Sequence, residues 1–192
     1  LSPLNLKPKH KQLSFYFPDN VVVLNLPKKY VAIAVGAAYF TKQIPLEKLV
    51  AVVDGLNCEV VLIGGKDDIE NAKTIQSKSS KKIINLVGDI DIPSSGKVIA
   101  SSSVLITGDT GMMHLSAALS KPVVAIFGST HPVLGYTPYY GGDSIPHHII
   151  QNENLSCRPC TKQGKDACPK GHFKCMLDLS VQDIIDKTEA LV

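Results

Sequence analysis

Residues 104–132 read VLITGDTGMMHLSAALSKPVVAIFGSTHP, and this stretch decides the fold of the chain. The runs 104–107 and 123–127 are short, apolar and β-branched, which is typical of strands buried on both faces of a parallel sheet. Residues 112–119 between them are predicted to form a helix that ends before Pro122. The stretch is therefore a βαβ unit. It predicts an α/β fold, a Rossmann-like parallel sheet with helices on both faces.

The turn Gly108-Asp109-Thr110-Gly111 follows the first of these strands and opens the helix. Asp and Thr are favoured caps, and the free N–H groups of a helix start attract anions, phosphate above all. Ligands of open parallel sheets lie at the carboxyl ends of the strands, where this turn and a second turn at 128–132 both fall. A plain βα connection is the alternative for a short Gly-x-x-Gly turn.

Other apolar runs are expected to complete the sheet, and periodic segments between them are expected to form helices. Strands are predicted at 30–35, 59–63, 83–86 and, at one edge, 147–150. Helices are predicted from Pro45 onward and over 66–78, 94–102 and 180–191.

A chain of 192 residues is long enough for one well-buried domain but not for two nucleotide-binding halves. We expect a linker over residues 1–29, with a strand-like run at 21–26, and one domain over 30–192. The net charge of +3 is small and scattered, which argues against nucleic acid as a partner. No apolar run approaches the length of a transmembrane helix, and the first residues lack a signal-peptide pattern. Because the chain starts at Leu1, we expect it to be a piece of a longer protein.

Four cysteines gather in a segment at residues 155–177, called here the Cys-rich segment: Cys157, Cys160, Cys168 and Cys175. The first two have C-x2-C spacing, and four thiolates can surround one tetrahedral zinc or iron. The lysines at positions 162, 165, 170 and 174 would favour thiolate formation. Such a site would be structural, because four protein ligands leave no position for a substrate. Two disulfides or four free thiols are the alternatives.

Three short motifs follow one another in the central stretch: DTGMMH at 109–114, KPVV at 121–124 and FGST at 127–130. Together they closely resemble the signature of glycosyltransferase family 9, the ADP-heptose:lipopolysaccharide heptosyltransferases. The family usually has Gly-Pro-Thr where this chain has GST, a departure that concerns only the geometry of that turn. The resemblance implies the C-terminal half of a two-domain GT-B fold, with the other half upstream. Cys-rich inserts similar to residues 168–176 occur in part of the family.

The resemblance also implies which residues bind the donor. In the family, a lysine in the loop after the first strand contacts the donor phosphates, and Thr41-Lys42 occupy that place here. The implied donor-binding residues are Thr41, Lys42, Asp68, Ile90, Asp109, Thr110, Gly111, Met112 and His114. An ammonium on a flexible stem can neutralise a diphosphate leaving group as charge builds on it, so Lys42 takes the catalytic role.

Each assignment has a structural alternative. Lys42 could be an ordinary solvated lysine. Asp68 could complement a helix dipole instead of binding ribose hydroxyls. Either Asp109 or Thr110 could cap the central helix, instead of binding sugar and phosphate respectively. Met112 could fill core space, and His114 could be a packing residue.

By implication, the intact enzyme moves heptose from ADP-heptose onto the lipopolysaccharide inner core, with inversion and without a catalytic metal. The base would come from the absent N-terminal domain, so the fragment by itself should bind donor weakly and catalyse nothing. The resemblance implies a cytoplasmic enzyme at the inner face of the inner membrane, with peripheral membrane association and no transmembrane segment. A non-catalytic nucleotide-binding module and a metal-stapled structural domain are the alternatives. In GT-B enzymes a C-terminal helix commonly crosses the domain junction, so part of the stripe on 180–191 is expected to lie uncovered.

Overall fold

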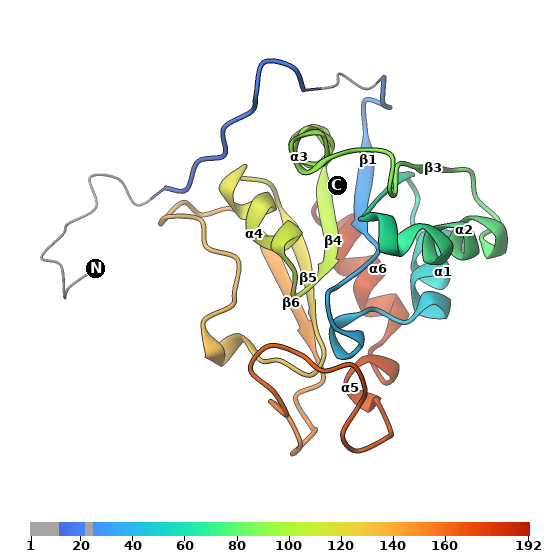
Figure 1. Cartoon of the computed structure of the whole chain (residues 1–192), viewed down its shortest axis with the longest axis vertical. Helices are drawn as coiled ribbons and strands as arrows, with labels where there is room; N and C mark the ends of the chain where they lie inside the picture. The colour runs from blue at the N-terminus through green and yellow to red at the C-terminus, as the bar shows by residue number, and fades with distance from the viewer. Residues whose placement is uncertain (1–11, 22–24) are drawn as a thin grey trace, which may run out of the picture.

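The computed structural model describes residues 12–21 and 25–192. Six strands, all paired in parallel, form one sheet in the order β3-β2-β1-β4-β5-β6 (Figure 1). The order reverses between β1 and β4, where the two halves of the sheet meet. The strands are β1 (Tyr30–Ala34), β2 (Glu59–Ile63), β3 (Ile83–Asn85), β4 (Val104–Gly108), β5 (Val123–Phe127) and β6 (His147–Gln151).

Helices cover both faces of the sheet, as the βαβ pattern predicts. Helices α1, α2 and α6 lie on one face and α3 and α4 on the other (Figure 1). The helices are α1 (Leu46–Gly55), α2 (Ile69–Lys78), α3 (Ile92–Ser101), α4 (Gly111–Ala118), α5 (Lys174–Leu177) and α6 (Val181–Glu189). Short 3-10 turns are η2 (Phe40–Lys42), η3 (Lys66–Asp68) and η4 (Pro132–Leu134). The predicted Rossmann-like α/β fold is thus confirmed.

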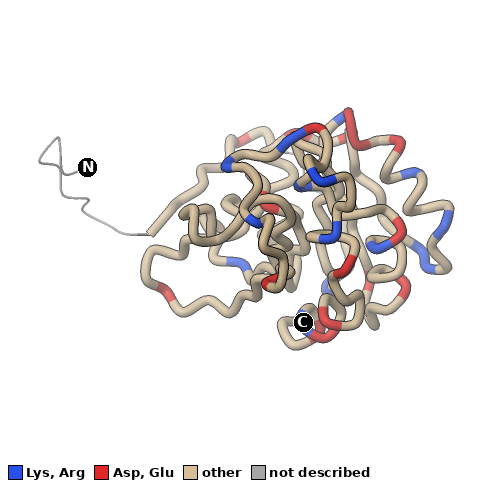
Figure 2. Tube along the Cα trace, turned by 90° about the horizontal axis from the view of Figure 1, so that it is seen from below, with Lys and Arg blue, Asp and Glu red and all other residues tan. Residues whose placement is uncertain are grey.

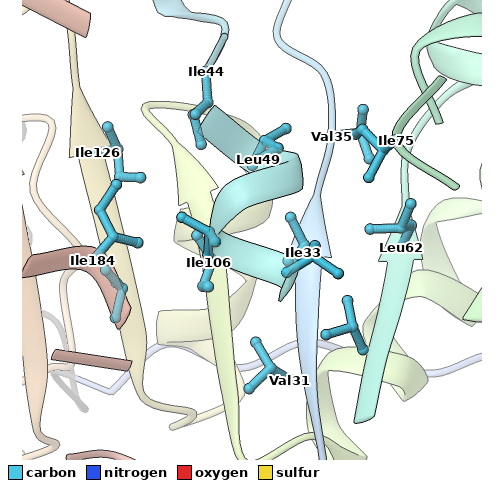
Figure 3. Packing of buried hydrophobic residues seen from close by; sticks show 14 of the residues in the cluster. Val31, Ile33, Val35, Ile44, Leu49, Leu62, Ile75, Ile106, Ile126 and Ile184 are labelled. Carbon is cyan, nitrogen blue, oxygen red and sulfur yellow. The ribbon is translucent and has the colours of Figure 1, made fainter. Parts of the chain in front are cut away.

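Strand β1 illustrates how the two faces are filled. All five of its residues are buried. Val31 and Ile33 point into the core under α1 and α6, where Figure 3 shows them beside Ile106 of β4 and Ile184 of α6. Tyr30 and the alanines of β1 point to the opposite core, under α3 and α4. Because both faces are covered, the strand is apolar throughout instead of alternating.

Helix α6 begins as predicted, with the Ser180 hydroxyl accepting a hydrogen bond from the Asp183 N–H at 3.2 Å. Its apolar stripe packs against α1, and Ile184, Ile185 and Thr188 are buried. These three residues are covered because α6 folds back onto the sheet, whereas Val181 and Leu191 at the two ends of the stripe are only half-buried. A Cβ on Gly55 would meet the end of the Ile185 side chain, so α6 approaches α1 closely at this glycine.

Helix α3 starts two residues before its predicted position. The Asp91 carboxylate caps it by accepting a hydrogen bond from the Ser94 N–H at 2.8 Å. Residues 12–21 and 25–29 of the expected linker contain no helix or strand, although Phe15 and Phe17 pack beside Gly96 of α3. Residues 22–24 of the predicted strand-like run lie outside the described residues.

Basic and acidic residues are interspersed along the described part of the Cα trace (Figure 2). Between Val104 and Gln151 the sequence holds only Asp109, Lys121 and Asp143 as charged residues. Asp109 is therefore the one charged residue of this stretch near the carboxyl end of β4. In the described ranges, no helix is long and apolar enough to cross a membrane.

Candidate functional site

A cavity of about 350 Å³ opens at the carboxyl ends of the neighbouring strands β1 and β4, where the strand order reverses. The loop after β1 and the turn after β4 both contribute to it, together with two later segments. The lining residues are Tyr39, Lys42, Asp109, Thr110, Gly111, His114, Tyr136, Lys162 and Gln163. Reversal of strand order leaves a crevice between the two loops, and nucleotides bind there in open α/β sheets.

The centre of the cavity wall is an ion pair between Lys42 Nζ and Asp109 Oδ2, 3.0 Å apart. The Lys42 side chain is 16% exposed and that of Asp109 is 5% exposed. The Thr130 hydroxyl donates a second hydrogen bond to Asp109 Oδ2 at 2.8 Å. Shielding from water strengthens such a pair and fixes its geometry. Asp109 therefore holds the Lys42 ammonium at the cavity.

Two glycines allow the Lys42 loop to reach this position. A Cβ on Gly108, the last residue of β4, would lie 2.6 Å from the Lys42 carbonyl oxygen. A Cβ on Gly128, just after β5, would lie 2.6 Å from the Thr41 carbonyl oxygen. The 3-10 turn η2 therefore rests directly on the ends of β4 and β5. Any larger residue at either glycine would push the turn away.

Helix α4 begins at the cavity, and Thr110 is its N-cap. The Thr110 hydroxyl accepts a hydrogen bond from the Met112 N–H at 3.3 Å. Capping is thus the role of Thr110, and Asp109 is engaged by Lys42 and Thr130 instead. Gly111 and His114, the first and fourth residues of the helix, both line the cavity. The positive end of the helix dipole adds to the charge of Lys42 at this point.

Thr41 lies beneath the cavity instead of lining it. Thr41 is 1% exposed. Its hydroxyl donates a hydrogen bond to the Lys165 carbonyl at 3.1 Å. The same hydroxyl accepts hydrogen bonds from the Lys165 N–H at 2.8 Å and from the Ser129 hydroxyl at 2.9 Å. These hydrogen bonds of the Thr41 hydroxyl are all made to other residues of the chain. In this structure Thr41 joins the Lys42 loop to the Cys-rich segment.

Asp68, Ile90 and Met112 do not line the cavity. The Asp68 carboxylate accepts a hydrogen bond from the Gly65 N–H at 2.9 Å and lies against Gly36, at the carboxyl end of β1. It shares the carboxyl edge of the sheet with Lys42 while capping the turn η3. Ile90 and Met112 are half-buried against the core under α3 and α4. The structure thus brings together Lys42, Asp109, Thr110, Gly111 and His114 from the predicted set.

All five cysteines are free thiols, so the disulfide alternative does not apply to this structure. Among residues 12–21 and 25–192, no group of three or more His, Cys, Asp or Glu side chains is placed to hold a metal ion. The four thiols predicted as ligands do not fit a metal site in this arrangement. Burial raises the pKa of Cys175 to about 11 and also raises that of Cys160, with a further contribution from nearby thiolates.

Arg158 holds the Cys-rich segment on the sheet. Its guanidinium donates to the carbonyls of Phe127 at 3.1 Å, Gly128 at 2.5 Å and Thr130 at 2.9 Å, and to that of Asn152 at 2.6 Å. A planar fork of five donors can reach four carbonyls at once, whereas a lysine ammonium has only three donors. The segment is therefore fixed by hydrogen bonds to the carboxyl end of β5.

Four lining residues are not among the predicted donor-binding residues: Tyr39, Tyr136, Lys162 and Gln163. The loop at Tyr39 and the aromatic turn at Tyr136 both follow predicted strands, so their position at the carboxyl edge was available as a signal. The sequence offered no such signal for Lys162 and Gln163, which come from the Cys-rich segment.

A larger hollow, about 780 Å³, lies at the amino ends of β1 to β3 between Lys29, Cys58 and Lys82. Parallel α/β sheets bind their ligands at the carboxyl ends of the strands. The smaller cavity at Lys42 is therefore the candidate site.

This chain is similar to a known protein family. The chain has a Rossmann-like α/β fold, and the model of "Glycosyltransferase family 9 (heptosyltransferase)" matches residues 3–170. The chain belongs to glycosyltransferase family 9.

Two curated relatives illustrate the similarity. Lipooligosaccharide heptosyltransferase 2 of Campylobacter jejuni serotype O:2 is 28% identical over 206 residues, covering 98% of this chain and 60% of the relative. Lipopolysaccharide heptosyltransferase 2 of Escherichia coli K12 is 25% identical over 138 residues, covering 70% and 37% respectively. The chain thus spans only part of the length of these relatives.

Solved structures agree on the fold. The E. coli ADP-heptose LPS heptosyltransferase II superposes with a TM-score of 0.67 at 23% identity, covering 88% of this chain and 47% of that one. The heptosyltransferase TibC, described as dodecameric and iron-containing, superposes with a TM-score of 0.63 at 15% identity, covering 91% and 48%. These similarities establish the Rossmann-like fold of the chain.

Proposed function

We propose that this chain is the donor-binding part of a heptosyltransferase and that the cavity beside Lys42 holds the diphosphate of ADP-heptose. The observation that carries the proposal is the Lys42–Asp109 ion pair on the wall of the cavity at the carboxyl ends of β1 and β4. An ammonium, a helix N-terminus and His114 converge there, and this combination favours a phosphate group. The curated relatives named as heptosyltransferases and an E. coli heptosyltransferase solved with ADP support the choice of ligand.

In the proposed reaction, an acceptor hydroxyl attacks the anomeric carbon of the heptose and the carbon–oxygen bond to ADP breaks, with inversion. The electron pair of that bond leaves with ADP. Lys42 and the start of α4 stabilise the charge that develops on the diphosphate, a role given to protein groups and not to a catalytic metal. Asp109 keeps Lys42 oriented for this purpose.

The remaining donor contacts belong to the same proposal. Asp68 binds the ribose hydroxyls from the adjacent carboxyl end of β2, and the second carboxylate oxygen of Asp109 binds hydroxyls of the heptose. Ile90 and Met112 contribute apolar surface on the nucleotide side. These roles rest on the family resemblance together with the position of each residue at the carboxyl edge of the sheet.

The base that deprotonates the acceptor is proposed to lie in the part of the family's length that this chain does not span. The acceptor is the lipopolysaccharide inner core, and it is proposed to bind there as well. For location, the proposal places the intact enzyme in the cytoplasm at the inner face of the inner membrane, in peripheral association with it.

Titration calorimetry of the 192-residue chain with ADP, adenosine and a plain sugar tests the proposal. ADP should bind, EDTA should leave its affinity unchanged, and Lys42→Met should weaken binding by about tenfold, which is the effect of losing one charge-assisted hydrogen bond. Lys82→Met, an exposed lysine at the opposite edge of the sheet, is the matched control and should bind ADP like the wild type. Absence of heat with ADP would favour a purely structural domain, and equal binding after Lys42→Met would refute the site.

Metal content is a separate question, because TibC is described as iron-containing and the spacing of the four cysteines suggests zinc or iron. Metal analysis of protein purified under reducing conditions addresses it. The thiol arrangement does not fit a metal site, so the expected result is less than one equivalent of metal per chain. One equivalent that is lost in Cys157→Ser and Cys160→Ser would instead establish the structural metal.

A further inference from the structure

The Cys-rich segment closes one side of the cavity, because Lys162 and Gln163 line it together with Lys42 and Asp109. Neither residue belongs to a family motif found in the sequence. The segment follows β6 at the far edge of the sheet and must therefore return across β5 to reach the cavity. Figure 1 shows this return, as the chain between β6 and α5 passes near the carboxyl ends of the strands.

Backbone hydrogen bonds fix the position of the segment at the cavity. The Thr41 N–H donates to the Lys165 carbonyl at 3.0 Å, and the Cys160 N–H donates to the Ser129 carbonyl at 3.1 Å. Thr41 and Ser129 are each 1% exposed, so these contacts are shielded from water. The segment is tied to the same turn that carries Lys42.

A tight turn then presents Lys162 to the cavity. The Thr161 hydroxyl accepts hydrogen bonds from the N–H groups of Gln163 at 3.3 Å and Gly164 at 3.2 Å. Gly164 has a φ of +120°, and a Cβ there would lie 2.6 Å from the Tyr39 side chain. Only glycine allows the turn to pack this closely on the cavity wall.

The charges around the cavity explain what Lys162 can do. Lys42 is neutralised by Asp109 at 3.0 Å, so this pair adds little net charge. Within the described part of the chain, no carboxylate lies within 4 Å of the Lys162 ammonium. A diphosphate carries more than one negative charge and needs more positive charge than the ion pair provides. We propose that Lys162 of the Cys-rich segment is a second phosphate-binding lysine of the donor site, an inference that rests on the proposed function.

The test compares ADP and adenosine binding in the wild type and in two lysine variants. Lys162→Met should weaken ADP binding by about tenfold, leave adenosine binding unchanged and reduce the dependence of ADP affinity on salt. Lys170→Met removes another exposed lysine of the same segment, outside the cavity, and should bind ADP like the wild type. Lys162→Arg should keep most of the affinity because it keeps the charge.

A backbone variant tests the position of the turn. Gly164→Ala should displace Lys162 and weaken ADP binding by about as much as Lys162→Met, with no additional loss in the double variant. Gly171→Ala is matched to it, because Gly171 also has a positive φ, +71°, but a Cβ there meets nothing within 4 Å. Gly171→Ala should leave ADP binding unchanged.

The outcomes separate this inference from the proposed function. If the wild type binds ADP and Lys42→Met weakens it while Lys162→Met does not, the role of Lys162 is refuted and the donor site stands. If the wild type does not bind ADP, both are refuted. Equal loss of ADP binding in Lys162→Met and Lys170→Met would refute a specific contact, because general charge would then explain the effect.

Discussion

The turn Gly108-Asp109-Thr110-Gly111 and the Cys-rich segment line the same cavity but are held there by different means. The turn is placed by its neighbours in the chain, since β4 ends and α4 begins within four residues. The Cys-rich segment is placed by distant partners, through Arg158 and the backbone of Lys165. One side of the cavity is therefore specified by local sequence, in the turn at residues 108–111. The other side, the Cys-rich segment, is specified only by long-range contacts.

The largest expected effect on stability comes from removing the Arg158 guanidinium. Arg158→Met removes hydrogen bonds to four carbonyls and should lower the free energy of unfolding by about 3 kcal/mol, because partly buried acceptors lose a charged donor. Urea denaturation measures it. Arg158→Lys should recover only part of the loss, since an ammonium lacks the planar fork. A change below about 1 kcal/mol would mean that the segment is held by other contacts.

Two glycine variants test whether the close approach of η2 to the end of β5 matters for stability. Gly128→Ala places a Cβ 2.6 Å from the Thr41 carbonyl oxygen and should destabilise the protein by about 2 kcal/mol through overpacking. Gly111→Ala meets nothing within 4 Å and should change stability by less than about 1 kcal/mol. Thermal unfolding of the two variants side by side is the measurement. Equal stability of the pair would contradict the packing of η2 on the end of β5.

A smaller effect on stability is expected at the turn that precedes α4. Thr110→Ala removes the N-cap of α4 and should cost about 1 kcal/mol, whereas Thr110→Ser keeps the hydroxyl and most of the stability. Chemical denaturation of both variants checks the assignment. If Thr110→Ala is as stable as Thr110→Ser, the Met112 N–H has another acceptor.

The smallest effect concerns reactivity and not stability. Burial alone would raise the pKa of Cys168, but hydrogen bonds from backbone N–H groups of the residues that follow it, Phe173 foremost, outweigh burial and lower that pKa. Burial raises the pKa of Cys175 to about 11. Cys168 should therefore be alkylated well before Cys175 at about pH 8, because the thiolate is the reactive form. Peptide mapping after iodoacetamide treatment measures the order, and a chelator that accelerates all four thiols would indicate a bound metal instead.

Much of the fold was predictable because its signals are local. The apolar runs at β1, β2, β4 and β5 and the cap of α6 each lie within a few consecutive residues. Helix α3 begins at Ile92, two residues before its predicted start, because the Asp91 carboxylate caps it. The burial of Ile185 depends on its close approach to Gly55 of α1, which no local pattern in the sequence reveals.

The candidate site also has a part that local sequence predicts and a part that it does not predict. The sequence determined the GDTG turn, the helix start behind it and the presence of Lys42 in a loop at the carboxyl edge. Tertiary structure alone decided that Lys42 pairs with Asp109, that Thr41 bonds to Lys165 across 124 positions of sequence, and that Lys162 reaches the cavity. The physical reason is that these contacts depend on strand order and on close approach at Gly108 and Gly128. Such approach is a property of packed segments, which short-range patterns in a chain do not encode.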